Sequence, residues 1–171
     1  FHNAPLAQKE VTDLLAPCLA STRDRMGVPS AGALYPIDAY VVCLKSVDMD
    51  AGIYYWRAGS QNLIFLRPLP ENINLAKNYA SEVSDHVSVV LFLVARVDAI
   101  LEKYGLRSFR LLFLEAGHFS QSLWLLATAL KIDFLIRDDF YDDEISRYLA
   151  LNPRQQRTLT SIMLSGAAKR P

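Results

Sequence analysis

Residues 108–131 form the longest helical segment of this sequence, and they constrain its fold most. The segment contains no proline and one interior glycine, Gly117, and its apolar residues surround the helix instead of forming one stripe. A helix that is apolar on every side belongs at the centre of a core or at an interface between subunits. We therefore expect a long apolar helix around which the rest of the chain is arranged.

Shorter segments with strand or helix character flank this helix. Strands are expected at 37–44, at 53–56 and 63–66 as a hairpin, at 87–94 as a strand buried on both faces, and at 160–164. Helices are expected at 12–19, 75–81 and 142–150, the last with acidic residues in its first turn. Helices and strands do not alternate strictly, so residues 1–171 predict one α+β domain.

Charge and cysteine usage argue against several classes of protein. Lys+Arg and Asp+Glu number 18 each and no basic patch stands out, so no nucleic-acid or membrane partner is expected. The longest apolar run, 88–95, is too short to cross a bilayer. Cys18 and Cys43 lack metal-ligand spacing and are interpreted as reduced, buried thiols of a cytoplasmic protein. The chain opens FHNAPL, without Met or a charged signal segment, so a native segment before Phe1 is expected.

Residues 29–36, PSAGALYP, place four small residues directly before a predicted strand. Small side chains at 30–33 allow a tight turn, and they equally allow a flat ligand to lie close against the backbone. The loop matches no nucleophile elbow, phosphate-binding loop or dinucleotide fingerprint. The residues alone leave both interpretations open.

Two adjacent ionisable residues, Lys103 and Tyr104, precede Gly105. One interpretation is an ordinary helix end, where a cation complements the dipole and glycine stops the helix. The other is catalytic: if Lys103 is desolvated its pKa falls, and it can act as a base near neutral pH with Tyr104 beside it.

Other polar clusters give weaker signals. Glu115 and His118 have the i, i+3 spacing of di-iron helices, but no second such pair exists, so a hydrogen-bonded pair in the core or at a subunit contact is expected. The acidic run 138–144 lacks the glycine and ligand spacing of an EF-hand, so it is interpreted as a solvated loop with a helix cap, and no metal site is expected. Lys169 and Arg170 follow Gly166 and form either a basic tail or a site for a phosphate dianion.

In order and spacing, these segments resemble the nitroreductase superfamily. The resemblance rests on SAGALYP at 30–36, the Tyr-Tyr hairpin, Lys-Tyr-Gly at 103–105 and LEAGH at 114–118, and it covers most of the chain. It is closest to the streptolysin/microcin-type azoline dehydrogenases, FMN enzymes that oxidise thiazolines and oxazolines to thiazoles and oxazoles in peptide natural products.

The resemblance implies a set of site residues and a fold. Lys103 and Tyr104 match the catalytic pair of the peptide-azoline branch, and Gly166, Lys169 and Arg170 match a segment near the FMN phosphate. The loop would lie against FMN through Pro29, Ser30, Ala31, Gly32, Ala33 and Leu34. The implied fold has a mixed or antiparallel central sheet flanked by helices, in a homodimer with FMN at an interface built on the long apolar helix.

The implied reaction leaves the pathway and the partners open. Lys103, helped by Tyr104, would remove a proton while the flavin takes a hydride, on a peptide whose azolines come from a separate cyclodehydratase. One alternative is an oxidase domain of a nonribosomal peptide synthetase, with a carrier-bound substrate. Others are a flavin-free scaffold subunit of a synthetase complex, and a nitroaromatic reductase that uses NAD(P)H.

Overall fold

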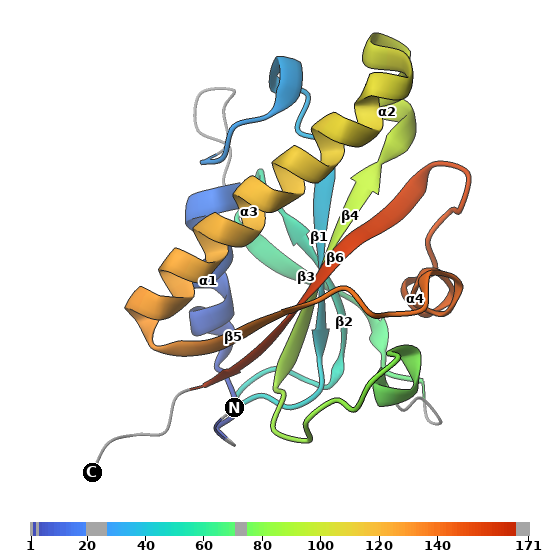
Figure 1. The fold of residues 1–171 in the computed structure, drawn as a ribbon. Helices are drawn as coiled ribbons and strands as arrows, with labels where there is room; N and C mark the ends of the chain where they lie inside the picture. The colour runs from blue at the N-terminus through green and yellow to red at the C-terminus, as the bar shows by residue number, and fades with distance from the viewer. Residues whose placement is uncertain (1, 3, 20–26, 71–74, 167–171) are drawn as a thin grey trace.

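The computed structural model describes residues 2, 4–19, 27–70 and 75–166. Within them, six strands form one antiparallel sheet in the order β3-β2-β1-β4-β6-β5 (Figure 1). The strands are β1 (Ile37–Cys43), β2 (Gly52–Arg57), β3 (Asn62–Pro68), β4 (Val89–Arg96), β5 (Ile132–Arg137) and β6 (Gln156–Gly166). The α-helices are α1 (Gln8–Leu19), α2 (Val97–Tyr104), α3 (Ser108–Leu130) and α4 (Asp142–Leu149). Short 3₁₀ turns are η1 (Ala31–Ala33), η2 (Leu75–Asn78) and η3 (Gly105–Arg107).

Helices cover both faces of the sheet, so the fold has three layers. Alternate residues of β4 point to opposite faces: Leu91 and Leu93 pack with α1 and α3, whereas Phe92 and Val94 pack with η2 and α4. Seven of the eight β4 residues are buried, because a central strand with helices on both sides has no solvent face. The expected α+β class and the strand buried on both faces are therefore confirmed.

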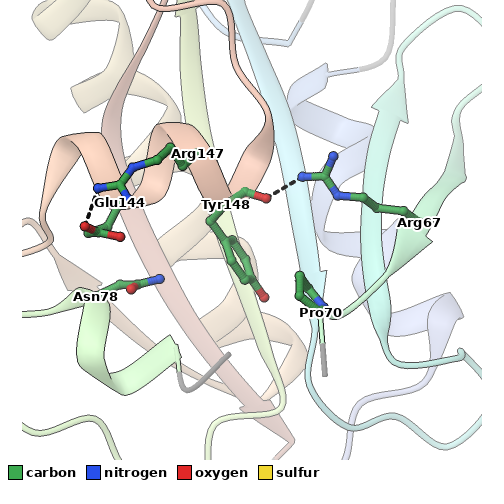
Figure 2. Close-up of a pocket in the computed structure, with 6 residues that line it drawn as sticks. All are labelled: Arg67, Pro70, Asn78, Glu144, Arg147 and Tyr148. Atoms are coloured by element: carbon green, nitrogen blue, oxygen red, sulfur yellow. Dashed lines mark hydrogen bonds and ion pairs between the residues drawn. The ribbon is translucent and has the colours of Figure 1, made fainter. Parts of the chain in front are cut away.

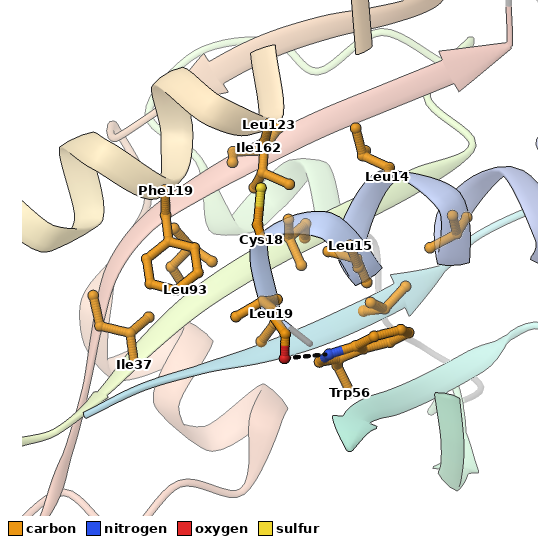
Figure 3. Close-up of a cluster of buried hydrophobic side chains, with 14 of the residues drawn as sticks. Leu14, Leu15, Cys18, Leu19, Ile37, Trp56, Leu93, Phe119, Leu123 and Ile162 are labelled. Atoms are coloured by element: carbon orange, nitrogen blue, oxygen red, sulfur yellow. Dashed lines mark hydrogen bonds between the residues drawn. The ribbon is translucent and has the colours of Figure 1, made fainter. Parts of the chain in front are cut away.

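The larger core lies between α1, α3 and the sheet (Figure 3). Phe119 and Leu123 of α3 are fully buried there, close to Cys18 of α1. Trp56 of β2 donates an indole N–H hydrogen bond of 3.5 Å to the carbonyl of Leu19, which anchors the end of α1 to the sheet. Both cysteines are buried free thiols, as expected, and burial raises the pKa of each to about 11.

Two elements differ from the sequence-based expectation. Residues 132–137, for which no strand was expected, form the edge strand β5, paired with β6. Residues 75–78 form only a 3₁₀ turn instead of a helix to 81. The sheet is antiparallel at each pair of strands in the described residues, which resolves the expectation of a mixed or antiparallel sheet.

The long helix α3 is buried on one side only. Its other side exposes large apolar residues, and so do the preceding turn and β5; they are Leu106, Phe109, Phe113, Leu114, Trp124, Leu125, Leu130, Leu135 and Ile136. We call this set the exposed apolar face. Within one chain the helix is therefore not enclosed by the core, and the expectation that it forms an interface remains a proposal.

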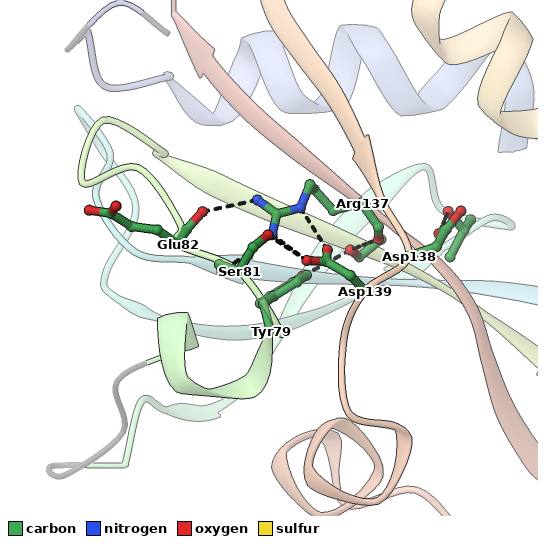
Figure 4. A network of polar contacts seen from close by, with 8 residues as sticks. Tyr79, Ser81, Glu82, Arg137, Asp138 and Asp139 are labelled. Carbon is green, nitrogen blue, oxygen red and sulfur yellow. Dashed lines mark hydrogen bonds and ion pairs between the residues drawn. The ribbon is translucent and has the colours of Figure 1, made fainter.

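A polar network clamps the segment after η2 to the end of β5 (Figure 4). Arg137 binds Asp139 through two hydrogen bonds of 2.7 Å and reaches the carbonyl of Glu82 at 3.2 Å. Ser81 donates a hydrogen bond of 2.7 Å to Asp139, and the Arg137 guanidinium lies 5.3 Å from the centre of the Tyr79 ring. We call this network the Arg137 clamp.

Candidate functional site

The loop 29–36 has a strained backbone at the point where it enters β1. Gly32, Ala33 and Tyr35 have φ angles of 60°, 54° and 46°. The left-handed region is open to glycine, but it costs a residue with a Cβ about 1–2 kcal/mol. Strain of this kind persists only where neighbouring structure holds it, and it clusters at functional sites.

The structure brings the small-residue loop and the Lys-Tyr pair together. A Cβ on Gly32 would lie 2.5 Å from the hydroxyl of Tyr104 and 2.6 Å from Nζ of Lys103, so both groups occupy the space that a side chain would need. α2 ends at Tyr104, and Gly105 at φ 53° turns the chain into η3 and α3. The helix-end interpretation of Lys103 and Tyr104 is therefore right, and it is compatible with their place at the loop.

Side chains from α3 and from β4 hold this loop. Ser30 accepts a hydrogen bond of 2.9 Å from the backbone N–H of Tyr35 and donates one of 2.7 Å to Glu115. Arg96 donates one of 2.8 Å from its guanidinium to the carbonyl of Tyr35, and it forms an ion pair of 3.3 Å with Asp38. The backbone of Tyr35, which has positive φ, is thus fixed at both its N–H and its C=O.

Glu115 differs from the sequence-based expectation in its partner. Its side chain is buried at 2% exposure and bonds to Ser30, whereas His118 is exposed on the same helix. Oε1 of Glu115 is buried without a hydrogen-bond partner among the described residues. Burial raises the pKa of the Glu115 carboxyl, and hydrogen bonds from Ser30 and from the Ala31 backbone oppose that rise. Sequence reasoning missed this contact and Arg96, because no local pattern links residues so far apart in the chain.

Gly166 does not join the loop within one chain. At the loop end of the sheet, Arg96 pairs with Gln156, but Gly166 at the other end of β6 pairs with Ile132 and Ala4. The length of β6 separates the two ends by roughly 33 Å. Lys169 and Arg170, expected near a phosphate, lie outside the described residues.

A hollow of about 380 Å³ lies on the face of the sheet covered by α4, away from the loop (Figure 2). Its two arginines already have partners: Arg67 donates to the carbonyl of Tyr148, and Arg147 pairs with Glu144. In the part of the chain that the structure describes, no group of three or more acidic, His or Cys side chains could hold a metal ion. None of the helices described is long and apolar enough to cross a bilayer. The loop with Lys103 and Tyr104 therefore remains the strongest candidate site.

Comparison with known proteins assigns the family. The model of the Nitroreductase family matches residues 1–166. This chain belongs to that family. A protein of Methanocaldococcus jannaschii that is named as a nitroreductase is 29% identical over 156 residues, which are 88% of this chain and 78% of that protein. Proteins of the nitroreductase family typically bind FMN, and the chain is accordingly a flavin oxidoreductase of this family.

Solved structures support the nitroreductase fold. One chain of the Escherichia coli microcin synthetase McbBCD complex, with truncated pro-MccB17 bound, superposes with a TM-score of 0.82 at 22% identity, over 99% of this chain and 67% of that one. A nitroreductase-family structure from Ralstonia eutropha gives 0.78 at 18% identity, over 99% and 78%. One from Desulfovibrio desulfuricans, in complex with FMN, gives 0.58 at 14%, over 100% and 83%. At these identities the likeness concerns the fold alone.

The loop fits the flat ring of FMN. Gly32 and Ala33 are exposed and small, so a flat ring can approach their backbone. The unpartnered oxygen of Glu115 also shows that the hydrogen bonding beneath the loop is incomplete. In one chain, Gly166 is too far from the loop to serve the same cofactor molecule.

Proposed function

We propose that this chain is an FMN-dependent dehydrogenase that oxidises thiazoline or oxazoline rings of peptides to thiazoles or oxazoles. The observation that carries the proposal is the contact of Lys103 and Tyr104 with Gly32, inside a strained loop of small residues. The structural likeness to a chain of a microcin synthetase complex supports the choice of a peptide substrate and of synthetase partners.

The proposed chemistry divides the work between cofactor and protein. Bound FMN would supply the hydride acceptor and pass the electron pair on to dioxygen. Lys103, in its neutral form, takes a proton from the ring carbon next to the one that loses the hydride. The azoline ring thereby loses two hydrogens and becomes aromatic. Tyr104 lies beside Lys103, whose Nζ is 5.5 Å from the centre of the tyrosine ring, and it positions the amine. Because Lys103 is exposed in one chain, the substrate, the cofactor or a second subunit has to cover it.

We further propose a homodimer formed through the exposed apolar face. Gly117 lies in the middle of α3 on its solvent side, and nothing lies within 4 Å of a Cβ placed there. A glycine inside a helix costs about 0.5–1 kcal/mol relative to alanine, and no contact with the described residues requires it here. A second α3 that crosses close to Gly117 would require it. Such a partner could also bring its Gly166 near the loop, which the same chain cannot do.

The dimer is tested by sedimentation of Phe113→Asp and Gly117→Leu. Both variants should sediment as monomers, because one places a charge and the other places bulk in the contact. Val47→Asp, at an equally exposed apolar residue away from α3, is the control and should remain dimeric. A monomeric wild-type protein would overturn this part of the proposal.

The first test of the function is the visible spectrum, with chromatography of whatever heat releases. Released FMN near one per chain supports a flavin site, whereas a colourless protein that takes up no added FMN favours the flavin-free scaffold. Lys103→Ala should then lose about 10²–10⁴-fold in oxidation of a thiazoline peptide, followed as loss of two hydrogens by mass, and should keep its flavin. Glu102→Ala, at the preceding exposed residue, is the control. Normal turnover of Lys103→Ala would remove Lys103 from the site, and bleaching by NADPH would indicate a reductase.

A further inference from the structure

Among the described residues, Glu115 is the one Asp, Glu, Lys, Arg or His that is buried. Burial of a carboxyl group is unfavourable unless its hydrogen bonds are satisfied, and here Oε1 has no partner in the part of the chain that the structure describes. A leucine or glutamine would fill the same volume without a buried charge. A role in packing therefore does not explain this residue.

The groups that bond to Glu115 belong to the loop. Ser30 donates its hydroxyl hydrogen to Oε2 at 2.7 Å. A serine hydroxyl has a single hydrogen, so the N–H that Tyr35 directs at Ser30 Oγ leaves this hydrogen free for Glu115. The result is a directed chain of hydrogen bonds from Tyr35 through Ser30 to Glu115.

This series of hydrogen bonds spans the strained part of the loop. Ala33 and Tyr35 are the two non-glycine residues of this loop with positive φ, and the hydrogen bond from Tyr35 to Ser30 closes the segment that contains them. Arg96 holds the far side through the carbonyls of Tyr35 and Pro36, at 2.8 Å and 2.7 Å. Without Glu115, Ser30 could rotate away, and one side of the loop would lose its support.

We propose that Glu115 is a positioning residue that, through Ser30, fixes the backbone of residues 30–35 in the conformation that receives the flavin. This inference rests on the proposed function. Glu115 acts as a hydrogen-bond acceptor, so glutamine can replace it and leucine cannot. It does not touch the substrate, and it acts on the cofactor only through the loop.

The experiment compares Glu115→Leu with Glu115→Gln by hydrogen exchange of peptides that cover residues 30–35, with and without added FMN. In Glu115→Leu, exchange at the Tyr35 amide should be about 10-fold faster, and the Kd for FMN should be about 10-fold weaker. In Glu115→Gln, both should stay within roughly 3-fold of wild type, because the acceptor is kept. Glu144→Leu, which removes an exposed carboxylate on α4, is the matched control and should change neither.

Two outcomes overturn the inference. One is unchanged exchange at residues 30–35 in Glu115→Leu; the other is a rise that is equal in β4 and α3, which would indicate general destabilisation. If Glu115→Leu does not fold, Ser30→Ala removes the same hydrogen bonds from a half-buried position and should accelerate exchange at Tyr35 more than in β4 or α3. If wild type binds no FMN, the proposed function fails, and the exchange data still decide whether Glu115 fixes the loop.

Discussion

Two serine–carboxylate pairs in this molecule have the same length and opposite surroundings. Ser30 donates to Glu115 and Ser81 donates to Asp139, each at 2.7 Å. Asp139 also receives two hydrogen bonds from the Arg137 guanidinium, and these bonds hold its pKa below the usual range. Glu115 is buried with one oxygen unpaired, and burial raises its pKa.

The difference separates a structural network from a functional one. In the Arg137 clamp, each charged group bonds to an opposite charge or to a carbonyl. The clamp therefore stabilises a turn and has no unsatisfied charge that would need a ligand. The loop network is incomplete and supports backbone strain, which a protein retains where a ligand benefits from it. Changes to the loop network should therefore affect ligand binding, and changes to the Arg137 clamp should not.

The largest effect is expected for Gly32→Ala. The new methyl group would displace the ends of Lys103 and Tyr104, and misplacement by about 1 Å can cost a reaction 100-fold. Because both ends are flexible, the fold itself should lose only about 1–2 kcal/mol, from the positive φ. Azoline oxidation and thermal unfolding measure the two effects. Gly59→Ala, where an added Cβ meets nothing within 4 Å, should change neither, and normal turnover of Gly32→Ala would contradict the proposed site.

Removal of each serine tests the comparison directly. Ser30→Ala leaves a buried carboxyl with one hydrogen bond fewer, so unfolding by urea should require about 1–3 kcal/mol less free energy. Ser81→Ala leaves the half-buried Asp139 with both hydrogen bonds from its arginine, and its urea midpoint should hardly move. Equal losses in the free energy of unfolding of the two variants would show that burial does not distinguish the two serine–carboxylate pairs.

Removal of the cation should separate stability from binding. Arg137→Ala breaks the bonds to Asp139 and to the carbonyls of Ser81 and Glu82, so the melting temperature should fall by roughly 2–6 °C. The affinity for FMN, titrated by fluorescence quenching, should not change, because the clamp lies against Tyr79 on the face of the sheet covered by α4, whereas the loop is bonded to α3 on the opposite face. A loss of FMN affinity at unchanged melting temperature would reverse the assignment of roles.

The two carboxyls should give opposite, smaller pH dependences. Because the pKa of Asp139 is lowered in the fold, its contribution is present above the ordinary value of about 3.9 and is lost as the pH falls. Because the pKa of Glu115 is raised, stability declines as the pH rises above the ordinary value of about 4.3. In urea titrations at rising pH, the free energy of unfolding of Glu115→Gln should increase relative to wild type, and that of Asp139→Asn should decrease relative to wild type. Parallel curves for both variants would contradict these directions.

The sequence predicted elements whose signal is local. The strand at 87–94 was recognisable because helices cover both of its faces, which leaves a continuous apolar run. β5 was missed because α3 ends at Lys131, which has φ 58°. Glycine usually occupies this left-handed position and marks the end of a helix in the sequence. The assignment of the loop and of Lys103 to one FMN site came from resemblance to a family, since no spacing in the sequence implies it. The contact of Ser30 with Glu115, 85 residues away, has no sequence signal at all.

The position of β6 has a consequence for how the chain reaches this fold. β4 lies in the middle of the sheet, but its partner β6 follows only after α2, α3, β5 and α4 have been made. Until residues 156–166 leave the ribosome, the most apolar strand has an open edge, and pairing over such a distance is slow. Ala4 forms a β-bridge with Gly166, so the segment at Ala4 cannot pair until residue 166 has been made. The newly made protein should therefore depend on chaperones during synthesis, and truncation before β6 should yield aggregates instead of a smaller folded domain.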